Sequence, residues 1–137
     1  MAQLIRPMKF IFSFILTLWL VACASTPDEI KLLDKSFALY EHALRWQDYD
    51  VLIGFHKNER DKLTQAKRQF LKQFRVSGYN VVYSNVAADQ RHANQIIEIK
   101  YYNQDYGVLR EMTLNNQWEY DEKALRWQLT NPIPDFR

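Results

Sequence analysis

The spacing of the apolar residues changes once along this chain, close to Gly78. Before that glycine, Leu33, Phe37, Tyr40 and Leu44 recur at intervals that place them on one face of a helix. After it, apolar and polar residues alternate, which is typical of strands with one buried face. Helices followed by such strands predict an α+β fold, in which N-terminal helices pack on one face of an antiparallel sheet of about four strands.

Three helices are expected before this change. The first begins at Thr26, Pro27 and Asp28, a cap followed by proline and acids, and ends at residues 46–50. The second covers residues 49–55 and ends within residues 54–58. The third starts at residue 59, and the glycine at position 78 is the predicted stop. Its expected apolar stripe consists of Leu63, Ala66, Phe70, Leu71 and Phe74.

Four strands are expected after the change, at residues 79–84, 95–102, 108–120 and 125–129. Polar turns separate them, and Pro132 and Pro134 end the regular structure. In the long third strand one face is apolar and the other polar. Its apolar face is formed by Val108, Met112, Leu114, Trp118 and Tyr120.

The N-terminus has the pattern of a targeting segment. Arg6 and Lys9 precede an apolar run of 13 residues, positions 10–22. That length fits the apolar region of a signal peptide, and it is shorter than the ~20 residues that a membrane-spanning helix needs. The sequence therefore predicts export rather than a membrane span.

The run ends in Leu20, Val21, Ala22 and Cys23, which resembles the lipobox of bacterial lipoproteins. The resemblance implies cleavage after Ala22 and a diacylglycerol thioether on Cys23, so that the protein is anchored to a membrane. Ala24, rather than aspartate, follows the cysteine, which by the same resemblance favours the periplasmic face of the outer membrane over the inner membrane. The alternatives are an ordinary cysteine beside an ordinary cleavage site, or a buried helix at residues 10–22.

These boundaries divide the chain into a lipoprotein signal peptide (1–22), a lipidated cysteine with a short tether (23–27), and a single α+β domain (28–137). The order of elements in that domain resembles the nuclear-transport-factor-2-like fold, in segments 38–50 and 118–127. The resemblance implies a cone, in which a curved sheet wraps the helical layer and encloses a cavity. A helical-hairpin repeat is the competing interpretation of residues 30–56.

Composition excludes several classes of protein. Of the 137 residues, positions 23–137 carry 16 basic and 16 acidic side chains, which disfavours a nucleic-acid partner. A single cysteine excludes a disulfide scaffold. His42, His56 and His92 lack metal-ligand spacing, and three glycines form no phosphate-binding loop. With no nucleophile motif either, we expect no metal, no cofactor beyond the lipid on Cys23, and no catalysis.

One candidate contact surface is a basic segment at residues 57–75. It has seven basic residues against two acidic ones, a local net charge of +5, and a bilayer or another anionic envelope surface would attract it. The alternative is a helix face that charge merely keeps solvated. The basic residues are Lys57, Arg60, Lys62, Lys67, Arg68, Lys72 and Arg75.

A second candidate is a pocket inside the cone. Arg110 is in phase with the apolar face of the third strand, so it needs an acid such as Asp48 or Asp50, a bound anion, or water. As a cationic anchor it would sit among aromatic side chains; otherwise it lies at the strand edge and reaches solvent. The aromatic residues expected around it are Trp46, Tyr83, Tyr101 and Trp118.

Together these patterns predict a membrane-anchored periplasmic lipoprotein that works as a non-catalytic binding module for an envelope protein or an anionic envelope surface. One alternative is a carrier or sensor of a small ligand in the cone cavity. The other is an enzyme of the same fold, for which no catalytic residues map onto this chain. The sequence leaves the oligomeric state open.

Overall fold

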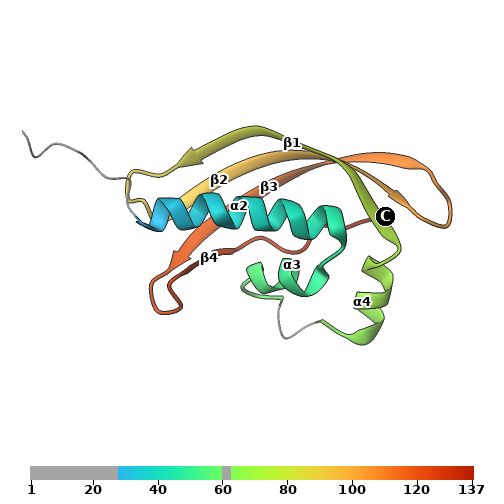
Figure 1. Cartoon of the computed structure of the whole chain (residues 1–137), viewed down its shortest axis with the longest axis horizontal. Coiled ribbons are helices and arrows are strands. Elements are labelled where there is room, and N and C mark those ends of the chain that lie inside the picture. The colour runs from blue at the N-terminus through green and yellow to red at the C-terminus, as the bar shows by residue number, and fades with distance from the viewer. Residues whose placement is uncertain (1–27, 60–62) are drawn as a thin grey trace, which may run out of the picture.

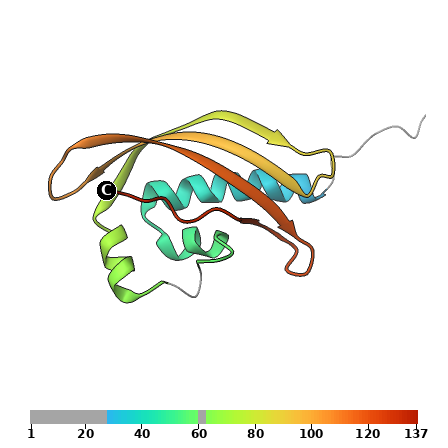
Figure 2. The same ribbon diagram turned by 180° about the vertical axis from the view of Figure 1, so that it is seen from behind.

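A computed structural model describes residues 28–59 and 63–137. Its strands form one antiparallel sheet in the order β1-β2-β3-β4, and the helices lie under the arch of the long strands (Figure 1). Seen from behind, the helices remain on that one side (Figure 2). The α+β architecture is confirmed. The elements are α2 (Asp28–Trp46), α3 (Tyr49–Phe55), α4 (Gln65–Leu71), β1 (Phe74–Val86), β2 (His92–Asn103), β3 (Leu109–Asp121) and β4 (Arg126–Leu129).

The first helix ends where predicted and the second has its predicted extent, whereas the predicted cap at Thr26 and Pro27 lies outside the described residues. In α2, Leu33, Tyr40 and Leu44 are buried, as their helical spacing requires. The helix ends at Trp46, and the next residue, Gln47, takes the left-handed conformation (φ 58°). Asp48 then caps α3, where its carboxylate accepts a hydrogen bond from the backbone N–H of Val51 at 3.3 Å.

The third helix is shorter than predicted, and the stop at Gly78 is wrong. Thr64 caps α4, which ends at Leu71, and β1 begins at Phe74. Phe74 extends a helical stripe in the sequence, but it also starts the strand alternation, and pairing with β2 decides between the two. Gly78 lies within β1 at a register shift, where a Cβ atom would come within 3.2 Å of the Lys100 side chain.

Aromatic rings fill the space between α2, α3 and the sheet. Phe37, Tyr40 and Phe55 surround the Trp118 indole with edge-on ring contacts at centroid distances of 5.4 to 5.7 Å. Trp127, which is also buried, donates from Nε1 to the Glu29 carbonyl at 2.7 Å and so fixes the start of α2 to β4. The inside of the curved sheet is therefore a packed core.

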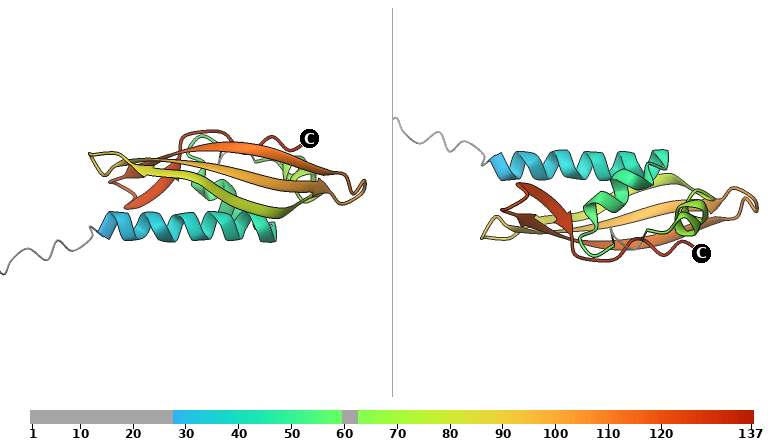
Figure 3. Two further views of the ribbon diagram at one scale, coloured as in Figure 1. Left: turned by 90° about the horizontal axis from the view of Figure 1, so that it is seen from above. Right: turned by 90° about the horizontal axis from the view of Figure 1, so that it is seen from below.

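The molecule is elongated, and different elements meet at its two ends (Figure 3). At the N-terminal end, the first turn of α2 meets the β1–β2 turn (87–91) and the β3–β4 turn (122–125). At the distal end, the last turn of α2 lies with α4 and the β2–β3 turn (104–108). At about 1.5 Å per residue, the 19 residues of α2 separate the two ends by about 27 Å.

Several sequence predictions fall outside the described residues. They are the signal peptide (1–22), Cys23 and its tether to residue 27, and two members of the basic segment, Arg60 and Lys62. Within the described ranges, none of the helices is long and apolar enough to cross a membrane.

Candidate functional site

A hollow of about 480 Å³ opens at the distal end, where the last turn of α2 meets β1 and β2. This volume is within the range of about 300–1,000 Å³ that small-molecule sites occupy. Two arginines and two aromatic residues are among the side chains that surround it, and no acid is. We call it the Trp46 hollow; its lining consists of Arg45, Trp46, Arg75, Val76, Ser77, Tyr102 and Gln104.

Side-chain amides hold the elements around this hollow in place. Gln47 donates from Nε2 to the carbonyls of Lys72 (2.9 Å) and Phe74 (2.7 Å), which ties the end of α2 to the start of β1. Gln104, in the β2–β3 turn, donates from Nε2 to the same Lys72 carbonyl, with a donor–acceptor distance of 2.8 Å. Tyr49 adds a bond to the Phe74 carbonyl at 3.1 Å, and burial raises the pKa of its phenol to about 12. The lining residues are thus carried on a cross-braced frame.

The electrostatics of the hollow favour an anion. Arg45 donates from Nε to Glu41 at 2.9 Å, so its charge is partly balanced. Arg75 is half-buried, and no acid in the described ranges forms an ion pair with it. A guanidinium presents several N–H donors in a plane that matches a carboxylate or phosphate.

Trp46 gives the hollow an open aromatic surface. Its side chain is 69% exposed, and its ring contact is with His42, at a centroid distance of 6.1 Å. By contrast, Trp118 and Trp127 are each 1% exposed. Tryptophan, tyrosine and arginine are the residues that most often dominate binding energies, and here all three line one small concavity.

The structure does not bring the five residues of the predicted cone pocket together. Tyr101 and Trp118 belong to the buried core, whereas Arg110 and Tyr83 are exposed. Arg110 has the predicted phase, but it lies near the start of β3, opposite the buried Tyr101, and its own side chain is exposed to water. Trp46 is the one member that lines the hollow described above.

The two acids named as partners of Arg110 are engaged elsewhere. Asp48 caps α3, and Asp50 forms an ion pair with Arg68 of α4. In the described structure, Arg110 therefore does not anchor an interior cavity, and neither Asp48 nor Asp50 balances its charge.

The basic segment does not form one helix face. Lys57 pairs with Glu119 at 3.8 Å, Arg68 pairs with an acid of α3, and Lys67 lies over the Phe70 ring at 5.5 Å. Lys72 is exposed, and Arg75, in β1, lines the hollow. The described members lie on different elements rather than along the long helix that we expected. Lys67, Arg68, Lys72 and Arg75 lie towards the distal end, whereas Lys57 pairs with Glu119, close to the β3–β4 turn.

The interior holds polar groups of a different kind. The Tyr40 hydroxyl, Asn116 Nδ2 and Trp118 Nε1 are buried without a hydrogen-bond partner among the described residues. Burial raises the pKa of Tyr40, so its phenol stays protonated. His56 Nδ1 contacts the Asn131 carbonyl at 2.8 Å, and burial lowers the pKa of His56. No three potential metal ligands cluster in the described part of the chain.

A second hollow, of about 640 Å³, crosses the middle of β1, β2 and β3. Its charges are Glu98, Lys100 and Glu111, of which the last two pair at 3.3 Å. Because it carries no unpaired cation and no highly exposed aromatic ring, it gives weaker grounds for a ligand than the Trp46 hollow does.

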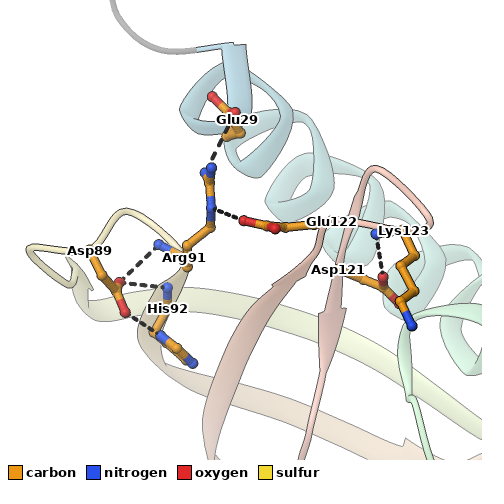
Figure 4. A network of polar contacts seen from close by, with 7 residues as sticks. All are labelled: Glu29, Asp89, Arg91, His92, Asp121, Glu122 and Lys123. Atoms are coloured by element: carbon orange, nitrogen blue, oxygen red, sulfur yellow. Dashed lines mark hydrogen bonds and ion pairs between the residues drawn. The ribbon is translucent and has the colours of Figure 1, made fainter.

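A network of ion pairs and hydrogen bonds centred on Arg91 and Asp89 lies at the N-terminal end (Figure 4). Arg91 bridges Glu29 at 3.5 Å and Glu122 at 2.9 Å, and Asp89 accepts from His92 Nδ1 at 2.6 Å. Hydrogen bonds from the backbone of Arg91 and from the His92 side chain lower the pKa of Asp89. This network joins α2 to two turns of the sheet, which is a structural role.

The sequence supplied only part of the Trp46 hollow. Trp46 and Arg75 were candidates, each for a different site, and Arg45, Tyr102 and Gln104 were missed. One signal was available: Arg45 and Trp46 are a cation and an aromatic residue at the end of an amphipathic helix. Nothing local in the sequence links that helix end to residues 102–104.

Comparisons with known proteins identify the fold. No family model and no curated protein sequence matches the chain. A SEC-C motif-containing protein from Psychrobacter arcticus matches 77% of this chain, with a TM-score of 0.57 and 14% identity, and this chain spans 62% of that protein. A second SEC-C motif-containing protein, from Rhodopseudomonas palustris, matches 66% of this chain and 69% of its own, with a TM-score of 0.53 and 13% identity.

A ketosteroid isomerase-like protein from Erwinia carotovora atroseptica matches 77% of this chain and 93% of its own length, with a TM-score of 0.57 and 12% identity. The chain therefore has a nuclear-transport-factor-2-like fold, as the order of its elements predicted. At such low identities the likeness covers the fold alone, and the function has to be argued from the residues of this chain.

Proposed function

We propose that this protein is a lipid-anchored, non-catalytic binding module of the bacterial cell envelope. The observation that carries the proposal is the lipobox, in which Cys23, the single cysteine of the chain, follows an apolar run of signal-peptide length. One acyl chain binds a membrane only marginally, whereas two or three chains anchor a protein stably. The proposed location is the periplasmic face of the outer membrane.

The geometry supports a binding role for the distal end. Four residues separate Cys23 from the start of α2, so an anchor there would hold the N-terminal end towards the bilayer. The distal end would then face away from the membrane, about 27 Å further out, given the length of α2. A packed core inside the sheet favours a surface site over a carrier cavity.

This orientation changes the interpretation of the basic segment. Four of its described cations, Lys67, Arg68, Lys72 and Arg75, lie towards the distal end, so the surface that these four meet is not the anchoring bilayer. We propose an anionic layer or partner on the opposite side.

Metabolic labelling with a palmitate analogue tests the anchor. Wild-type chain should incorporate label, and Cys23→Ser should lose it because the thioether cannot form. Ser25→Ala serves as a matched control beside the site and should label normally. Ala22→Trp should label but retain its signal peptide, since a bulky residue blocks the peptidase pocket. Equal labelling of the wild type and Cys23→Ser would overturn the proposal.

A further inference from the structure

We infer that the Trp46 hollow binds a carboxylate-bearing sugar. The inference rests on the proposed function in taking the distal end as the binding surface, and it adds the chemical class of the ligand. It depends on the geometry of the hollow and on no property of the lipid anchor.

The first step is the sign of the charge. The lining contains Arg45 and Arg75 and no acid, and Arg75 has no ion-pair partner within the described ranges. A half-buried guanidinium without a counter-charge favours a bound anion, because pairing recovers part of the hydration that burial removes. The planar guanidinium selects planar, bidentate anions, of which a carboxylate is the simplest.

The second step is the shape of the ligand. Trp46, 69% exposed, offers a flat indole face that folding leaves uncovered. The apolar C–H face of a sugar ring stacks on such a surface, while the ring hydroxyls remain available for hydrogen bonds. Tyr102 provides a second aromatic side chain on the same hollow.

The third step is the supply of neutral hydrogen-bonding groups. Gln104 uses Nε2 to donate to the Lys72 carbonyl, which leaves its Oε1 to accept from a hydroxyl. Ser77 donates to the Lys100 carbonyl at 3.3 Å, so its oxygen lone pairs are also able to accept. Acceptors beside cations suit a ligand that carries both hydroxyls and an anionic group.

An acidic peptide fits this hollow less well. Acidic peptides are recognised by clusters of arginines, and other peptides by strand pairing or by apolar anchors inserted into pockets. Of the two arginines in the lining, Arg45 already pairs with Glu41. The aliphatic residue of the lining is Val76, which is itself 8% exposed and therefore offers little surface. The hollow offers a flat aromatic surface and positive charge, rather than a pocket for an apolar side chain.

The test uses the full-length chain in a non-ionic detergent and two sugars that differ by one lactyl group. N-acetylmuramic acid carries a carboxylate, and N-acetylglucosamine is its neutral counterpart. Ligand-observed NMR and titration calorimetry should show binding of the acid in the range of about 1 mM, with the neutral sugar at least about fivefold weaker. Added salt should weaken the binding of the acid.

Variants assign the binding to the hollow. Arg75→Gln should weaken the binding of N-acetylmuramic acid by roughly tenfold or more, as expected for the loss of a charge-assisted hydrogen bond. Trp46→Ala should weaken both sugars. Arg126→Gln, the same charge change at an exposed position of β4, is the matched control and should bind as the wild type does. Thermal unfolding of each variant, compared with the wild type, checks that the fold is retained.

The inference is overturned if the two sugars bind equally, if Arg75→Gln and Arg126→Gln behave alike, or if neither sugar binds at its highest soluble concentration. Binding of an acidic tetrapeptide in preference to the acidic sugar would also overturn it. The two proposals fail separately. If the chain is labelled but binds neither sugar, only this inference is wrong. If the chain is not labelled but binds N-acetylmuramic acid, only the lipoprotein proposal is wrong.

Discussion

Arg91 at the N-terminal end and Arg75 at the distal end stand in opposite electrostatic surroundings. At the N-terminal end, Arg91 is shared between Glu29 and Glu122, and Asp89 holds His92. At the distal end, Arg75 has no acidic partner among the described residues. The first set of charges connects α2 to the turns of the sheet, whereas the second set lies beside an exposed indole.

This difference separates groups that support the fold from groups that remain available to a ligand. Exposed ion pairs each contribute little, about 0–1 kcal/mol, but a network that joins three segments positions those segments. Arg75 forms no ion pair with the described acids, and the Trp46 indole is mostly exposed, so both remain available to a ligand. We propose that this ligand binds at the distal end.

The largest predicted effect contrasts two tryptophans. Trp118→Ala should cost about 3–5 kcal/mol of unfolding free energy, because it removes the ring at the centre of the aromatic core. Trp46→Ala should change stability by less than about 0.5 kcal/mol, since its side chain is mostly exposed. Denaturant unfolding of both variants measures the contrast. Similar losses from the two substitutions would remove the distinction between core and distal end.

A smaller effect contrasts two arginines. Arg91→Ala should destabilise the fold by about 1 kcal/mol, because two partly screened ion pairs and a contact with the Tyr120 ring at 5.2 Å are lost together. Added salt should reduce this loss. Arg75→Ala should be closer to neutral for stability. If Arg75 proved the more important for folding, it would be a structural residue, and the case for a free cation would fail.

Acid should destabilise the interior through His56. Burial lowers the pKa of His56, so the unfolded chain binds a proton on this histidine more readily than the folded chain does. Stability is therefore full above the ordinary histidine pKa of about 6.5 and is lost as the pH falls from there through the folded value. His56→Asn keeps a donor for the Asn131 carbonyl and removes the titration.

Unfolding experiments at pH 7.5 and pH 5 measure this difference. The wild type should lose more stability than His56→Asn across the interval. Equal losses would mean that His56 does not carry the acid sensitivity.

Much of the fold follows from the sequence because periodicity is a local property. The spacing of Leu33, Tyr40 and Leu44 fixes α2, and alternation fixes β2 and β3. The α4–β1 boundary did not follow, because Phe74 satisfies both a helical and a strand pattern until β2 pairs with it. Gly78 looked like a helix stop, although its role is the close approach to Lys100.

The Trp46 hollow could be predicted only in fragments. Its members come from α2, β1, β2 and the β2–β3 turn, and the amide bonds of Gln47 and Gln104 bring these elements together. Such bonds leave no periodic trace in a sequence. Arg110 shows the opposite case: its phase on β3 follows from the sequence, but phase does not show whether a side chain at the start of a strand is covered.

Sedimentation of the full-length chain with purified peptidoglycan, in non-ionic detergent, tests most directly whether the distal end is the binding end. Two double variants remove equal charge: Arg45→Gln with Arg75→Gln at the distal end, and Lys123→Gln with Arg126→Gln at the N-terminal end. We expect the wild type and the N-terminal variant to sediment equally at low salt, and the distal variant to remain in solution. Salt should release the bound protein as the Debye length shortens to about 8–10 Å. Equal sedimentation of the two variants, or no sedimentation of a folded wild type at low salt, would contradict the account.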